Sequence, residues 1–277
     1  MNIRKMAFLL FMCIGTISIC SCKKKNEEMP AHRYGYGAEI TYNIFIDSTQ
    51  ERLDSNANPV GTPAGHGSLS PRYNYLQVGQ IFLFDSTSPG NGWSTLNSLN
   101  ITGSNGTITV GSHYNGSAIT FNCLRINFDF QNYEFDCAID GNYLSVNMLS
   151  FLGSSWMQNP LFIRDSVVSH DTVESQGSWY LEIDSVGMGV VLHGLTSTLT
   201  APNVLQNTSP LQYGGYSLTC PINPPLTFSG DQTHTLNVSI SSNHCFEWIE
   251  HSNPGSFDPL NGDTVFDVGL RGVKVSW

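Results

Sequence analysis

Short runs of alternating apolar and polar residues recur along the chain, and no segment keeps an apolar period of 3.6 residues for three helical turns. Residues that favour tight turns, such as Asn105-Gly106, separate the runs. Strands are therefore predicted at residues 39–46, 75–84, 107–110, 118–128, 133–139, 144–148, 161–168, 178–183, 189–192, 217–220, 233–240 and 265–275. Many short strands joined by such turns indicate an all-β fold, an antiparallel β-sandwich.

A short strand-like run followed by aspartate and serine recurs four times, at Asp47, Asp85, Asp165 and Asp184. A short polar side chain at a strand end can accept a hydrogen bond from the backbone two residues on, which predicts Asx-type turns. Aspartate followed by Ser or Thr and then by Val or Thr occurs at these positions and at Asp171 and Asp263. This triplet resembles the O-glycosylation acceptor of Bacteroidota envelope proteins. The turn and the modification remain alternative explanations.

The first 28 residues have the layout of an export signal. Arg4 and Lys5 precede 14 residues without charge, a length typical of a signal peptide and too short for a bilayer, which needs about 20. The run ends in Ile19-Cys20-Ser21-Cys22, which resembles the lipobox of bacterial lipoproteins. The resemblance implies a diacylglyceryl thioether on Cys22 and an amine-linked acyl chain such as palmitate. Several acyl chains anchor a protein stably where one is marginal. A plain secretory signal is the alternative.

This signal divides the chain into three predicted parts. Residues 1–21 are the lipoprotein signal peptide, residues 22–35 a disordered tether, and residues 36–277 a single β-sandwich domain, with two smaller β domains as the alternative. The charged tract that begins at Lys23 resembles the export signal of Bacteroidota-type surface lipoproteins. The predicted location is therefore the bacterial cell envelope, as an outer membrane lipoprotein held through its lipid. Which leaflet it faces, and whether it reaches the cell surface, stays open.

The charge of the chain excludes one class of partner. Its 12 basic and 22 acidic residues give a formal net charge of −10. Removal of Arg4 and Lys5 with the signal peptide leaves ten basic residues and a net charge of −12. A body of this charge is repelled by phosphate backbones, so nucleic acid is excluded as a partner. Apolar residues make up 40% of the chain, which is enough for a packed core.

Four cysteines follow the predicted lipidation site, namely Cys123, Cys137, Cys220 and Cys245. An even number in an oxidising compartment predicts disulfides. A hairpin with its turn at residues 128–132 would place Cys123 opposite Cys137, and Cys220 would then pair with Cys245. No C-x-x-C motif supports redox catalysis or a thiolate zinc site.

Signatures of known catalytic sites are missing from the sequence. It contains no H-E-x-x-H, no G-x-S-x-G, no P-loop and no dinucleotide fingerprint. Ser68 follows Gly65-His66-Gly67 without the strand–turn–helix pattern of a nucleophile elbow. We therefore predict a protein that is not an enzyme and has no cofactor. A pair of strand carboxylates, drawn for example from Glu134 and Glu182, would support glycan processing instead.

The densest group of potential metal ligands lies at residues 243–251. On a short helix, His244, Glu247 and His251 would share one face, and imidazole with carboxylate suits zinc, copper or iron. The alternative is a short helix that packs Phe246 inward and binds no metal.

A further resemblance covers about half of the chain. Residues 75–83, a strand-rich middle and the stretch Gly189-Val-Val-Leu-His193-Gly194 are similar to the MbnP-type domains of secreted and lipidated bacterial proteins. The resemblance implies a β-sandwich surface protein, which in some members is associated with copper and a haem peroxidase partner. It adds His193 to the candidate metal ligands.

The sequence as a whole predicts a lipid-anchored envelope or surface β-sandwich that binds an unidentified protein or glycan ligand without catalysis. Copper or zinc binding of the MbnP type and glycan processing are the two alternatives. The ligand, the metal, glycosylation and the oligomeric state are left open by the sequence.

Overall fold

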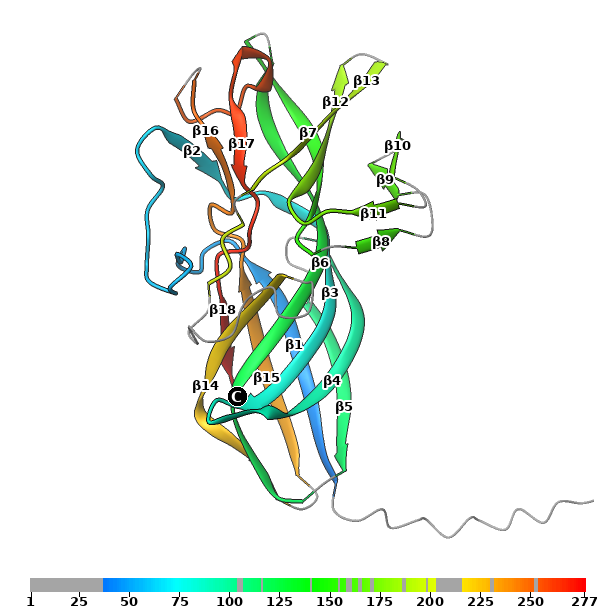
Figure 1. The fold of residues 1–277 in the computed structure, drawn as a ribbon, viewed down its shortest axis with the longest axis vertical. Coiled ribbons are helices and arrows are strands. Elements are labelled where there is room, and N and C mark those ends of the chain that lie inside the picture. Colours follow the sequence, from blue (N-terminus) through cyan, green and yellow to red (C-terminus); the bar gives the residue numbers. More distant parts are fainter. Residues whose placement is uncertain are drawn as a thin grey trace, which may run out of the picture. The chain divides into compact units, whose positions relative to one another are not determined.

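Figure 1 shows the computed structural model of the chain, in which a seven-stranded, a four-stranded and a three-stranded sheet carry most of the described strands. The structure describes residues 37–103, 107–115, 117–139, 141–153, 155–157, 161–163, 166–169, 172–185, 188–197, 199–202, 216–229, 232–251 and 254–277. Residues 35–277 form one compact unit. The predicted signal peptide, the tether and the lipidation site Cys22 lie outside the described residues.

The described strands, in chain order, are β1 (Gly37–Asp47), β2 (His66–Leu69), β3 (Arg72–Asp85), β4 (Ser88–Thr102), β5 (Thr107–Asn115), β6 (Ile119–Ile139), β7 (Asn142–Phe151), β8 (Ser155–Met157), β9 (Leu161–Ile163), β10 (Ser166–Ser169), β11 (Thr172–Glu174), β12 (Ser178–Ser185), β13 (Met188–Leu195), β14 (Tyr216–Phe228), β15 (Thr233–Ser241), β16 (Phe246–Ile249), β17 (Thr264–Asp267) and β18 (Val273–Ser276). A 3₁₀ turn, η1, covers Pro259–Asn261. No helix in the described part of the chain is long and apolar enough to cross a membrane.

Strand β6 organises the seven-stranded sheet because it is 21 residues long. Its first part, up to Phe128, pairs with β14, and its second part, from Phe130, pairs with β7, while β3 runs along the other edge. The sheet has the order β13-β12-β7-β6-β3-β4, with β14 attached to β6. The predicted hairpin at residues 128–132 is therefore wrong. This stretch has no Gly or Pro to form a tight turn, and it continues as strand.

The four-stranded sheet has the order β18-β15-β1-β5. Along β1, Ile40, Tyr42 and Ile44 are fully buried and the residues between them are partly exposed, as expected for a strand with one face in a core. β1 pairs with β5 antiparallel and with β15 parallel. The parallel pair joins positions 194 residues apart, such as Asn43 and Asn237.

The two large sheets pack face to face around one hydrophobic core. Tyr114 of β5 contacts Phe121 of β6 and Phe228 of β14, with ring centroids 6.2 and 5.4 Å apart. At the sheet edges, β14 lies beside β18 and β4 beside β5. The all-β, sandwich-like fold predicted from the hydrophobic pattern is confirmed. The pattern did not indicate that one strand pair would be parallel.

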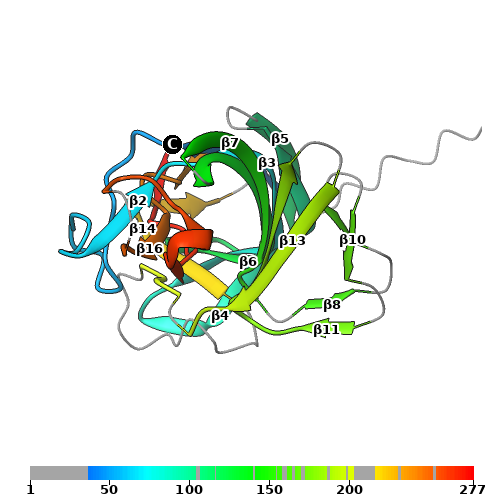
Figure 2. The same ribbon diagram turned by 90° about the horizontal axis from the view of Figure 1, so that it is seen from above.

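The three-stranded sheet has the order β17-β16-β2. In Figure 2, β2 and β16 lie on one side of β7, and β13 lies on the opposite side of β7. The short helix predicted at residues 244–251 is wrong, because residues 246–249 form β16, with Phe246 and Trp248 fully buried. Gly67 of β2 allows this packing, since a Cβ there would lie 2.2 Å from the Trp248 indole ring.

Two of the predicted aspartate turns are confirmed. The backbone N–H of Thr49 donates to Asp47 at 2.8 Å, and that of Thr87 donates to Asp85 at 3.0 Å. These bonds, together with those from the two threonine hydroxyls, lower the pKa of both aspartates. Asp165 and Asp171 lie outside the described residues.

The four cysteines are free, buried thiols in the structure. Cys123 and Cys137 lie 14 positions apart on the same strand β6, about 46 Å of extended chain, so they cannot bridge. The predicted pairing depended on the hairpin that the continuous strand replaces. Cys245 contacts the Tyr73 hydroxyl at 3.3 Å. Burial raises the pKa of Cys137 to about 12 and that of Cys245 to about 11.

Candidate functional site

The four predicted metal ligands do not come together. His193 lies exposed on β13 with its ring 6.2 Å from that of Tyr180, and His251 is exposed after β16. His244 is exposed in the turn before β16, whereas Glu247 of β16 is buried. Among the residues that the structure describes, no group of three His, Cys, Asp or Glu side chains could hold a metal ion. The shared face predicted for His244, Glu247 and His251 is wrong because it required a helix.

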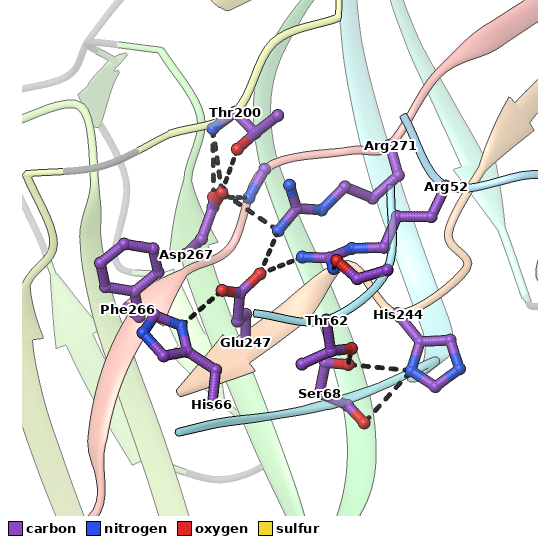
Figure 3. A network of polar contacts seen from close by, with 12 residues as sticks. Arg52, Thr62, His66, Ser68, Thr200, His244, Glu247, Phe266, Asp267 and Arg271 are labelled. Carbon is purple, nitrogen blue, oxygen red and sulfur yellow. Dashed lines mark hydrogen bonds and ion pairs between the residues drawn. The ribbon is translucent and has the colours of Figure 1, made fainter. Parts of the chain in front are cut away.

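Glu247 is the centre of a buried polar cluster (Figure 3). Its side chain is 2% exposed and accepts hydrogen bonds from three residues. Arg52 and Arg271 both donate to Oε2, the latter at 2.9 Å, and His66 Nδ1 lies 2.6 Å from Oε1. Because a carboxylate only accepts, Nδ1 of His66 carries the proton. Three segments far apart in the sequence thus meet on one carboxylate.

Asp267 extends this cluster on the side of β17. Its carboxylate lies 3.1 Å from Nη2 of Arg271 and accepts the backbone N–H of Gly269 at 2.7 Å. The backbone N–H and the hydroxyl of Thr200 also donate to it. Arg271 therefore joins the two carboxylates, and Asp267 fixes the neighbouring chain segment through backbone bonds.

The four charged groups of the cluster balance one another. Two guanidinium groups face two carboxylates, and all four side chains are at most 6% exposed. Burial lowers the pKa of Arg52, the like charge of Arg271 adds to this effect, and Glu247 and Asp267 oppose it. Each ion would be costly to bury alone, so the cluster is stable only while its opposite charges balance.

The cluster contains the kind of carboxylate pair that a glycosidase needs, but in a different setting. Glu247 and Asp267 are saturated with donors and closed off from solvent. Acid–base catalysis requires a carboxyl group within reach of a substrate proton. These two groups are therefore structural.

An open depression of about 430 Å³ lies next to the cluster. Its lining residues come from the connection between β1 and β2 and from the turn before β16, namely Glu51, Arg52, Pro59, Val60, Gly61, Thr62, Asn243 and His244. Arg52 connects the depression to the buried cluster, because its Nη1 donates to the Gly61 carbonyl at 2.7 Å while its Nη2 donates to Glu247. The cluster thus holds one wall of the depression in place.

His244 occupies a special backbone position at the edge of this depression. Its φ is +48°, in the left-handed region that residues other than glycine seldom adopt. Its Nδ1 lies 2.9 Å from the Ser68 hydroxyl and 3.2 Å from the Ser68 carbonyl oxygen. Because the carbonyl can only accept, Nδ1 must carry a proton, and in the neutral ring Nε2 then keeps its lone pair.

This tautomer decides what Ser68 can do. A nucleophilic serine must give its proton to the histidine nitrogen that it contacts. Here that nitrogen is itself a donor, and the Ser68 hydroxyl contacts the Thr62 hydroxyl on its other side. The arrangement orders three polar side chains without activating the serine, as the sequence context of Ser68 indicated.

Sequence reasoning singled out His244 and Glu247 but missed the other members of the buried cluster around Glu247. Arg52, His66, Asp267 and Arg271 belong to no motif and lie up to 219 positions apart. One weak signal existed, because a chain with only 12 basic residues places Arg271 within an apolar stretch that also contains Asp267. A charge between apolar residues is typical of a buried ion pair.

Comparison of the chain with protein-family models, curated proteins and solved structures found no match. The location of a ligand site is therefore inferred from the geometry alone.

Proposed function

We propose that the protein is a non-catalytic binding module of the bacterial cell envelope, held at the outer membrane by lipid on Cys22. The ligand site in this proposal is the depression beside Arg52. The observation that carries the proposal is the fixed position of Arg52, which joins the wall at Gly61 to the buried carboxylate of Glu247. A wall held by such contacts is ordered before the ligand arrives, so binding costs less conformational entropy.

The volume and the lining of the depression support a small ligand or one unit of a larger one. A volume of about 430 Å³ lies in the range of small-molecule sites. Thr62, Asn243 and His244 supply polar groups, and Val60, which is 39% exposed, supplies apolar surface. Sites of this kind combine a few placed polar groups with apolar contact area.

A fragment screen followed by amide NMR tests the location of the site. Fragments that bind are expected to shift the backbone amide signals of Thr62, Asn243 and His244. The amides of residues 188–195, which lie on the other side of β7, serve as the internal control. Hits that map consistently to another surface, or a screen without hits, would contradict the proposed site.

Lipid anchoring has support from the sequence alone, through the run Ile19-Cys20-Ser21-Cys22. Cys22→Ala is expected to move the protein from the membrane fraction to the soluble fraction, or to stop its processing. Cys20→Ala is the matched control and is expected to leave both unchanged. Equal labelling of the wild type and Cys22→Ala by a fatty-acid analogue would refute the anchor.

A further inference from the structure

Three side chains at the depression form an ordered chain of hydrogen bonds. His244 Nδ1 must be a donor, so the Ser68 hydroxyl accepts from it at 2.9 Å (Figure 3). The Ser68 proton is then available for its other neighbour, the Thr62 hydroxyl oxygen. Once Thr62 accepts this bond, its own proton is free to point toward a ligand. The hydrogen-bond chain thus makes Thr62 a donor and leaves Nε2 of His244 as an acceptor.

Two further groups complete the polar lining. Asn243 accepts from the Ser70 hydroxyl through Oδ1 at 3.3 Å, and no described residue takes the N–H groups of its amide. The Glu51 side chain is exposed and has no partner among the described residues, so its carboxylate is an acceptor. The depression therefore offers two donors, Thr62 and Asn243, and two acceptors, His244 and Glu51.

This set of groups discriminates between classes of ligand. A carboxylate or phosphate can only accept, so it would oppose the lone pair of His244 and the charge of Glu51. An ammonium group can only donate, so it would meet the N–H groups of the Asn243 amide and leave them without an acceptor. Hydroxyl groups donate and accept, and they match all four positions.

The charges around the depression disfavour an anionic ligand. The positive charge of Arg52 is compensated by Glu247, and its Nε is buried. The remaining charge in the lining is that of Glu51, on a protein whose net charge is −10. Pro59 and Val60, both exposed, offer an apolar surface for the C–H face of a ring.

We propose that the depression binds a neutral polyhydroxylated ligand, one unit of an uncharged saccharide. The proposal rests on the function proposed above and adds the class of the ligand. Thr62 and Asn243 donate to sugar oxygens, and His244 Nε2 and Glu51 accept from sugar hydroxyls.

The test is a binding panel on the full-length protein, measured by calorimetry and by the amide signals of residues 60–62 and 243–244. Neutral probes are glucose, galactose, mannose and N-acetylglucosamine with their oligosaccharides, and the charged probes are glucuronate and glucosamine. At least one neutral probe is expected to bind, tenfold or more tightly than either charged sugar. Thr62→Val and His244→Asn are each expected to weaken this binding at least tenfold. Asparagine is chosen because it tolerates the left-handed backbone of His244.

Two further variants sharpen the test. His251→Asn alters an exposed histidine outside the depression and is expected to leave affinity unchanged. Glu51→Gln removes the repulsion between the Glu51 carboxylate and the carboxylate of glucuronate. It is expected to bring the affinity for glucuronate closer to that for the neutral sugar. Melting temperatures equal to that of the wild-type protein would show that all four variants are folded.

The outcomes separate the ligand class from the binding function. A charged sugar that binds at the depression more tightly than every neutral probe would overturn the proposed class and leave the binding site intact. Absence of any shift of the amide signals of residues 60–62 and 243–244 with the whole panel would also overturn the class. The fragment screen then decides independently whether the depression binds ligands at all.

Discussion

Replacing Glu247 with glutamine tests the buried cluster directly. The wild-type cluster is neutral when His66 is neutral, because Arg52 and Arg271 face Glu247 and Asp267. Glutamine keeps the shape of the side chain but leaves two guanidinium groups facing one carboxylate. Breaking a buried ion pair from one side costs about 3–5 kcal/mol, because the remaining charge is uncompensated. We expect a loss of this size in the free energy of unfolding.

The assay is equilibrium unfolding in urea together with thermal melting. For a domain of this size each kcal/mol corresponds to about 2–4 °C, so the midpoint is expected to fall by roughly 6–20 °C. The double variant Arg52→Gln/Glu247→Gln restores neutrality and is expected to recover a large part of the loss. The matched control is Asp136→Asn, which breaks an exposed pair with Arg72 whose side chains are 56% and 61% exposed. That change is expected to cost at most about 1 kcal/mol.

The reasoning fails if Glu247→Gln costs no more than Asp136→Asn. It also fails if the double variant is less stable than Glu247→Gln, because charge balance would then not be the source of the loss.

Three further changes test other parts of the structure. Phe246→Ala removes a ring that stacks 4.4 Å from Phe135 and is expected to cost about 3–5 kcal/mol in urea unfolding, whereas Tyr143→Ala, at a side chain 72% exposed, should change stability by at most about 0.5 kcal/mol. Burial raises the pKa of Asp129, so the folded state loses stability as the pH rises from the pKa of an unfolded aspartate, about 3.9, through the higher pKa of the folded state. In thermal melts, Asp129→Asn should therefore stabilise the protein at pH 7 and have no effect at pH 3. Stabilisation of equal size at both pH values would contradict the burial explanation. The thiols of Cys123, Cys137, Cys220 and Cys245 are buried, and their pKa values are raised. A thiol reagent at pH 8 should therefore label none of the four quickly in the native protein, and all four once the protein is unfolded in guanidinium. Fewer than four labelled thiols after unfolding would indicate a disulfide.

The fold class was readable from the sequence because its signals are local. The alternation of apolar and polar residues in β1 fixes which face is buried, and it needs no knowledge of the partner strand. The turns at Asp47 and Asp85 were predictable for the same reason, since each bond spans two residues. The O-glycosylation resemblance at these positions stays a prediction.

The predictions of a hairpin at residues 128–132 and of a helix at residues 244–251 were wrong for related reasons. The even number of cysteines suggested a turn at residues 128–132, although this stretch contains neither Gly nor Pro. In residues 244–251 the spacing of polar side chains fitted a helix, but pairing with β2 and β17 made the segment a strand. Cross-strand hydrogen bonds outweighed a weak local preference.

The candidate site was decided by tertiary structure. Glu247 was visible in the sequence as a possible ligand, yet its partners Arg52 and Arg271 lie in the β1–β2 and β17–β18 connections, which only the folded chain brings beside β16. The parallel pairing of β1 with β15 likewise joins positions 194 residues apart. Sequence periodicity reports which face of a strand is apolar, and this determined the all-β sandwich. It carries no information on which distant charges will meet, because that depends on the mutual burial of segments that only the folded chain brings together.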